Sequence, residues 1–198
     1  MKKNSFTLIE LIVSLDIISI VCLIVVGTYV YVIGSREKTL GQMDIQQEGQ
    51  YIMSSIAKDI RSSKIDYDAY SQPIDSPIGY LILQDIDETN CIHYRRVVSD
   101  SRGALQKCSK EKGGKKNCSS VCEEGDFQDL TSQDVDAKSL YFYIHPTEDP
   151  FNESSSSAAK KQQPRVTITF NLESLKEKVG KHRIMFQQTI LQRWTKRE

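Results

Sequence analysis

The sequence predicts an α+β protein in which one long N-terminal helix packs, by its second half, on an antiparallel β-sheet. Three observations predict this class. Residues 5–33 are predominantly apolar, isoleucines recur at helical spacing as far as residue 60, and short alternating segments without intervening helices follow. The chain has 198 residues, enough for one modest domain beyond the first apolar segment.

The first apolar segment, residues 6–34, predicts a transmembrane helix, because about 20 apolar residues span the hydrocarbon core of a bilayer. Lys2 and Lys3 precede it, so the positive-inside rule places the N-terminus in the cytoplasm and the domain outside. Two carboxylates, Glu10 and Asp16, interrupt the run. Charges inside a membrane are costly and usually mark function, although the sequence identifies no specific partner for Asp16.

Two alternatives compete with a functional transmembrane helix. A cleaved secretory signal peptide has an apolar stretch of about 7–15 residues and then a small-residue cleavage site. This run is far longer, and no clear A-x-A site follows it. An ordinary signal anchor explains the length and the lysines but gives no reason for Glu10.

The helix is expected to continue through residues 35–63 as an amphipathic segment. This stretch contains no proline, and its apolar stripe comprises Ile45, Ile52, Ile56 and Ile60. Three charged residues fall off the stripe and are expected to face water: Lys58, Asp59 and Arg61. Glycines at near-heptad spacing either admit neighbouring helices or allow the helix to bend: Gly27, Gly34, Gly41 and Gly49.

Residues 64–198 predict a β-rich globular domain outside the cytoplasm. Pro73 and Pro77 mark residues 64–78 as a loop. Strand patterns occupy residues 80–83, 92–95, 140–144, 166–172 and 184–190, and the alternation is clearest in 166–172. Two stretches, 107–136 and 147–164, are expected to be excursions from the sheet.

Four cysteines lie in this domain: Cys91, Cys108, Cys118 and Cys122. An even number in an oxidising compartment predicts two disulfides, with three possible pairings. A tight hairpin near Asp100 favours Cys91–Cys108 with Cys118–Cys122, and the nested pairing Cys91–Cys122 with Cys108–Cys118 is a close second. A four-thiolate zinc site is a weaker alternative, because no C-x2-C pair is present. The fifth cysteine, Cys22, is expected to pack in the membrane as a small apolar residue.

Catalytic and metal-binding patterns are weak. His93, His145 and His182 share no motif, and G-x-S-x-G, Walker and H-E-x-x-H patterns are absent, so neither an enzyme nor a cofactor is predicted. An oxygen-rich cluster could hold calcium, but it lacks EF-hand spacing and is better interpreted as a solvated turn: Asp85, Asp87, Glu88 and Asn90.

The net charge of the chain does not indicate nucleic-acid binding, because 26 basic and 26 acidic residues balance. Loss of residues 1–5 would remove two lysines and leave a net charge of −2. Lysines cluster in residues 107–116, and residues 123–136 hold six acids and no base. This charge pattern is typical of a solvated loop. Its functional alternatives are pairing between subunits or capture of DNA through phosphates, without aromatic residues for base stacking.

The N-terminal string K-K-N-S-F-T-L-I-E-L-I-V-S-L resembles the processing signal of type IV pilins and type II secretion pseudopilins. The resemblance implies a pilin-like fold and a leader of residues 1–5. It also implies cleavage between Ser5 and Phe6 by a prepilin peptidase, and N-methylation of Phe6. Ser5 departs from the glycine usual before the cut. Glu10 matches the family's assembly glutamate, which would pair with the Phe6 amine of a neighbouring subunit.

A second resemblance concerns the order of segments after the anchor. Q-Q-E-G-Q-Y-I-M-S-S-I-A-K-D-I-R-S-S, C-I-H-Y-R-R, L-Y-F-Y-I and P-R-V-T-I-T-F are similar to J-type minor pseudopilins and W-type minor pilins. It implies a minor subunit of an inner-membrane filament machine, with other (pseudo)pilins, the peptidase–methyltransferase and an assembly platform as partners. The alternative is a signal-anchored extracytoplasmic binding domain that does not polymerise.

Overall fold

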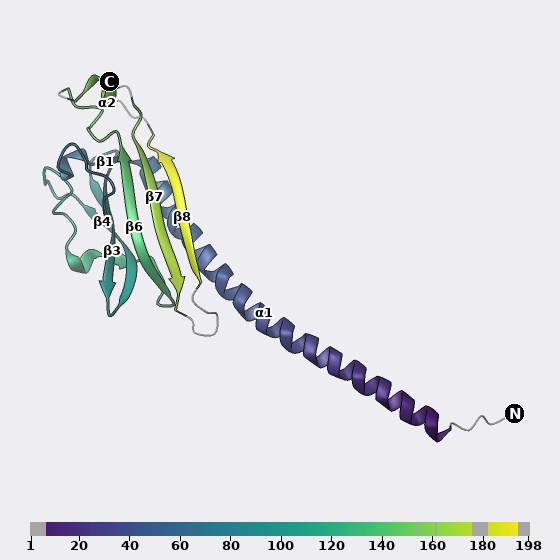
Figure 1. Cartoon of the computed structure of the whole chain (residues 1–198). Coiled ribbons are helices and arrows are strands. Elements are labelled where there is room, and N and C mark those ends of the chain that lie inside the picture. Colours follow the sequence, from purple (N-terminus) through teal and green to yellow (C-terminus); the bar gives the residue numbers. More distant parts are fainter. Residues whose placement is uncertain (1–6, 154, 161, 176–181, 194–198) are drawn as a thin grey trace.

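One helix dominates the computed structural model, which describes residues 7–153, 155–160, 162–175 and 182–193 (Figure 1). Helix α1 (Leu8–Ser62) has 55 residues, begins after the N-cap Thr7 and ends where Ser63 becomes extended. Its first half projects away from the rest of the molecule, and its second half runs along the sheets (Figure 1). The predicted α+β class and the long apolar helix are confirmed.

Five antiparallel strands form the first sheet, in the order β1-β2-β3-β4-β5. Their bounds are β1 Ser63–Ile65, β2 Tyr80–Asp85, β3 Asn90–Ser99, β4 Arg102–Glu111 and β5 Gln128–Asp129. Short 3-10 helices, η1 (Tyr67–Ala69) and η2 (Glu124–Asp126), lie in the connections. Asp100 and Ser101 both have positive φ, which suits a two-residue turn between β3 and β4.

The second sheet has the order β6-β7-β8 and is also antiparallel. Its strands are β6 Val135–His145, β7 Arg165–Ser174 and β8 Arg183–Leu191, and a short helix, α2 (Ser157–Lys160), lies between β6 and β7. All five predicted strand segments are strands. The predicted start of an excursion at residue 107 is wrong, because β4 continues to Glu111 by pairing along the whole of β3.

Strands β4 and β6 bring the two sheets together. The backbone N–H of Gly103 donates to Asp136 Oδ1 at 2.8 Å, and Arg96 Nε donates to the carbonyl of Ala137. A Cβ at Gly103 would lie 2.1 Å from that carbonyl oxygen, so a side chain there would force the strands apart. The register of β6 shifts between Ala137 and Ser139, immediately beside this contact.

The core lies between the second half of α1 and the inner faces of both sheets. The predicted stripe is confirmed: Ile45, Ile52, Ile56 and Ile60 are at most 1% exposed. They join one cluster with strand residues such as Leu81, Phe142 and Phe170. Lys58 and Arg61 are exposed as predicted. The expectation for Asp59 is wrong, because its carboxylate is buried against Tyr94 and Lys107.

Gly49 allows β8 to approach α1 closely. A Cβ at this position would lie 2.1 Å from the Phe186 ring, which stacks on Phe170 with centroids 5.0 Å apart. The sequence predicts that the glycines either admit a neighbouring helix or allow bending. At Gly49 the group that approaches is the Phe186 ring of the same chain. Among the residues that the structure describes, none has an atom within 4 Å of a Cβ at Gly27 or Gly34, apart from their own neighbours in the helix.

Candidate functional site

The candidate site is the first half of α1, an apolar surface that the domain leaves uncovered. Its large apolar side chains from Leu8 to Ile33 are 43–79% exposed. They point in all directions around the helix, so there is no polar face to meet water. Within the described chain, α1 is the one helix long and apolar enough to cross a membrane, with a window of mean hydropathy 2.7 and no buried residues. These properties are those of a single-pass membrane segment.

Thr7 and Glu10 form a capping box at the start of this segment. Thr7 Oγ1 accepts a hydrogen bond from the backbone N–H of Glu10 at 3.4 Å. In return, Glu10 Oε2 accepts from the backbone N–H of Thr7 at 3.5 Å and from its hydroxyl at 3.2 Å. A carboxylate here also complements the positive end of the helix dipole. In the single chain, Glu10 therefore stabilises the helix start.

The T-x-x-E spacing before an apolar run is a known capping signature, so this role was visible in the sequence. Ser5 and Phe6, which the sequence predicts to flank the processing site, lie outside the described residues. The assignment of the processing site to Ser5 and Phe6 remains a prediction.

Asp16 lies further along the same segment, among apolar residues. Its backbone carbonyl accepts from the Ser19 hydroxyl at 2.8 Å. Its carboxylate makes no hydrogen bond or ion pair with the residues that the structure describes, in contrast to Glu10.

The four domain cysteines form two disulfides, as predicted, but neither favoured pairing is correct. Cys91 joins Cys118 with Cα atoms 5.5 Å apart, and Cys108 joins Cys122 with Cα atoms 6.3 Å apart. In the β3–β4 register, Cys91 faces Lys110 and Cys108 faces His93. Cys91 and Cys108 are therefore offset by two residues in the β3–β4 register. The diagonal distance across such an offset is generally too long for a disulfide.

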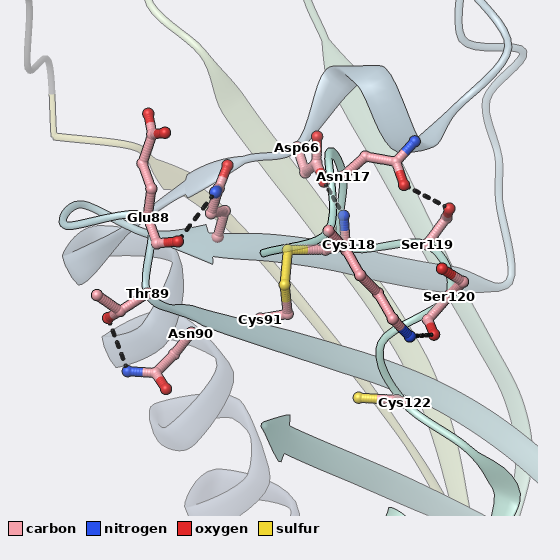
Figure 2. Close-up of a disulfide and its surroundings, with 12 residues drawn as sticks. Asp66, Glu88, Thr89, Asn90, Cys91, Asn117, Cys118, Ser119, Ser120 and Cys122 are labelled. Carbon is pink, nitrogen blue, oxygen red and sulfur yellow. Dashed lines mark hydrogen bonds between the residues drawn. A yellow bond between two sulfur atoms is a disulfide. The ribbon is translucent and has the colours of Figure 1, made fainter. Parts of the chain in front are cut away.

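The chain after β4 instead returns across this face of the sheet and delivers one cysteine to each strand. Figure 2 shows the bond from Cys91 to Cys118, and the Cys118 amide directed at Asp66. That amide donates to Asp66 Oδ2 at 2.7 Å, which also ties the loop to the segment after α1. With all four sulfurs in disulfides, the four-thiolate zinc alternative is wrong. Cys22 is exposed on the single helix.

The weak calcium candidates occupy the β2–β3 turn with local partners. Asp85 Oδ1 accepts from the Ile86 amide at 2.8 Å, and Glu88 forms an ion pair with Lys64. The Asn90 side-chain amide donates from Nδ2 to Thr89 Oγ1 at 3.1 Å. No group of three or more His, Cys, Asp or Glu in the described residues, Asp87 included, is arranged to hold a metal. These contacts favour the solvated-turn interpretation.

The basic and acidic stretches meet within the chain. Lys110 Nζ lies 2.7 Å from Asp126 Oδ2, and the uncharged Gln106, just before the basic stretch, donates from Nε2 to Asp129 Oδ1 at 2.8 Å. The hydrogen bond between the Lys110 and Asp126 side chains raises the pKa of Lys110 and lowers the pKa of Asp126. Part of the charge considered for pairing between subunits is therefore already used inside one domain.

Comparisons with protein-family models, with curated proteins and with solved structures found no match to this chain.

The histidines do not gather into a site. His93 is buried in β3 beside Phe127, and burial lowers the pKa of its imidazole. His145 and His182 lie at opposite ends of the second sheet, since β6 ends at His145 and His182 precedes β8 at the other end of β7. Apart from the exposed helix, the described domain thus contributes packing, disulfides and internal ion pairs.

Proposed function

We propose that this chain is a minor (pseudo)pilin subunit of a type IV pilus or type II secretion-like filament, made as a single-pass precursor in the inner membrane. The observation that carries the proposal is the exposed apolar half of α1, whose first turn lies in the string S-F-T-L-I-E and contains Glu10. Such a surface needs lipid before assembly and other apolar helices afterwards.

Glu10 suits a role in setting the stagger between helices. A carboxylate in a helical bundle without water is costly unless it is paired. Cleavage before Phe6 would create an amine four residues from Glu10, and the amine of one subunit would neutralise the Glu10 of its neighbour. A head-to-tail contact of this kind does not close, so it generates a helical polymer.

Two further features support a membrane segment with the domain outside. Tyr29 and Tyr31 are 67% and 79% exposed near the end of the apolar run, and Arg36 follows. Aromatic and basic residues commonly mark the interface between lipid and water. The two disulfides suit an oxidising compartment, which the positive-inside rule also assigns to this side.

The size of the domain supports a minor rather than a major subunit. Two sheets cover the helix from Gly41 onward, one further excursion is held on the first sheet by both disulfides, and such bulk would crowd a tightly packed shaft. The expected partners are other (pseudo)pilins, a prepilin peptidase–methyltransferase and the membrane assembly platform.

The deciding experiment is intact mass and N-terminal peptide mapping of the chain purified from its native membrane. A mature start at N-methylated Phe6 is the expected result, and it would show that Ser5 is accepted before the cut. Retention of residues 1–5 in a stably inserted protein would instead favour the signal-anchored domain that does not polymerise.

A further inference from the structure

Asp16 is the one charged side chain deep inside the apolar segment. It lies about 12 Å along the helix from Leu8, in a segment about 38 Å long as far as Ile33. A bilayer core is about 30 Å thick, so the carboxylate falls within the hydrocarbon when the helix spans it. Carboxylates at such depth usually pair with another group and serve a function.

The chain itself cannot supply that partner. Residues 4–35 contain no Lys, Arg or His, and Arg36 lies 20 residues beyond Asp16, about 30 Å along the axis. Glu10 already has Thr7 in the single chain and, under the proposed function, the amine of a neighbouring copy. Each processed copy would bring two carboxylates and one amine into the membrane. Assemblies of identical copies therefore remain one cation short at every Asp16.

The helix face that carries Asp16 is continuous with the face that packs on the domain. Asp16, Gly34 and Ile52 are spaced by 18 residues, which is five helical turns, so they lie in line. Ile52 is fully buried against the sheets. Gly27 lies within about 20° of the same line, and no other part of the described chain comes within 4 Å of the Cβ position of Gly27 or Gly34. A second helix can therefore approach this face closely below the domain.

We propose that Asp16 is the docking point for a transmembrane helix of a different protein, which carries a Lys or Arg at the same depth. The partner helix packs along the Asp16–Gly27–Gly34 face, and its cation compensates the carboxylate. The inference rests on the membrane insertion proposed above. It goes beyond that proposal by assigning different binding partners to the Glu10 and Asp16 carboxylates. Glu10 serves contacts between like subunits, whereas Asp16 selects an unlike one.

Photo-crosslinking from the full-length chain in its native membrane tests this assignment. A photoreactive phenylalanine analogue is placed at Ile20 or Leu23, four and seven residues from Asp16 on the same face. Matched probes at Ile18 and Val25 lie on the opposite face. The expected adduct forms with one other membrane protein from positions 20 and 23 but not from 18 and 25. Its crosslinked peptide contains a Lys or Arg within an apolar segment.

The charge is then varied with the probe held in place. Asp16→Glu should retain the adduct, and Asp16→Leu should reduce its yield about tenfold or more. Asp16→Lys combined with the partner's basic residue changed to Asp should restore it. An unchanged yield in Asp16→Leu, adducts with a second copy of this chain only, or a partner peptide without a base would each overturn the inference.

Carbonate extraction and the mature N-terminus, measured on the same samples, separate the two proposals. A chain that is inserted and cut before Phe6 but shows no Asp16-dependent adduct refutes the docking inference alone. A chain that is not inserted refutes both.

Discussion

Asp59 of α1 and Tyr94 of β3 are joined by a buried hydrogen bond of 2.5 Å between the phenol and Asp59 Oδ2. Lys107 Nζ of β4 lies 2.6 Å from the same oxygen, so one carboxylate links the helix to two strands. Burial and the hydrogen bond to Asp59 raise the pKa of the Tyr94 phenol, which keeps it a donor. This cluster fixes how the second half of the helix sits on the first sheet.

Replacing Asp59 with Ala should lower the free energy of unfolding of the domain by about 2–3 kcal/mol. The change leaves the Tyr94 hydroxyl and the Lys107 ammonium without their shared acceptor. Urea unfolding of the full-length chain in detergent, followed by near-UV circular dichroism, measures the effect. Lys58→Ala, one residue away and exposed, is the matched control and should change stability by less than about 0.5 kcal/mol. Equal effects of the two variants would contradict a structural role for the cluster.

Gly49→Ala should destabilise the packing of β8 on the helix by about 1–3 kcal/mol, because the added methyl overlaps the Phe186 ring. Thermal unfolding in detergent checks this effect. Gly34→Ala adds the same methyl at a position where no described residue packs within 4 Å, and it should leave the domain's melting temperature unchanged. Phe186→Leu should recover part of the loss when combined with Gly49→Ala, and a purely additive pair would argue against the clash.

Peptide mapping without reduction should exclude the pairing Cys91–Cys108 with Cys118–Cys122, and a double cysteine variant should then support Cys91–Cys118 with Cys108–Cys122. Trypsin leaves Cys118 and Cys122 on one peptide, so both strand cysteines should be linked to it in one cluster. The double variant Cys91→Ser/Cys118→Ser should contain no titratable domain thiol, because Cys108 and Cys122 still pair. Removal of either disulfide should cost about 2–4 kcal/mol of stability. Free thiol at Cys108 and Cys122 in that double variant would contradict the pairing.

Glu10→Gln should abolish incorporation into a filament while leaving membrane insertion intact. Glutamine at this position can still complete the capping box with Thr7, but it cannot neutralise a neighbouring amine. Sheared-filament fractions compared with carbonate-extracted membranes give the readout. Thr7→Ala is the complementary control, since it removes the cap and keeps the carboxylate, and it should still be incorporated. Normal incorporation of Glu10→Gln would remove the assembly role.

His93 should make the domain less stable as the pH falls from about 7.5 to 5.5. Burial lowers its pKa below the ordinary value near 6.5, so in this window the unfolded chain binds more protons than the folded one. The free energy of unfolding therefore decreases toward acid pH. His93→Gln should flatten the curve of stability against pH, whereas His145→Gln, at an exposed position, should not. An unaltered slope in His93→Gln would assign the dependence to other groups.

Local patterns accounted for much of the architecture. The apolar run, the Ile45–Ile60 stripe and the alternation in β7 are periodicities within single segments, and each predicted its element correctly. No strand pattern marks β4, because its own sequence carries few large apolar residues, Leu105 being the main one, and only the expected hairpin near Asp100 pointed to it. It is a strand because it pairs with β3 along its whole length, and a pattern confined to residues 102–111 does not contain that partner.

By itself the sequence determined the long helix, its exposed apolar half, the two carboxylates within it and the disulfide-forming cysteines. Those features depend on residue type and on spacing along one chain segment. Only the tertiary structure decided which cysteines pair, where Asp59 points and what fills the space at Gly49. Each of these depends on strand register and on residues from different segments of the chain, where a shift of one or two residues changes the neighbour that a side chain meets.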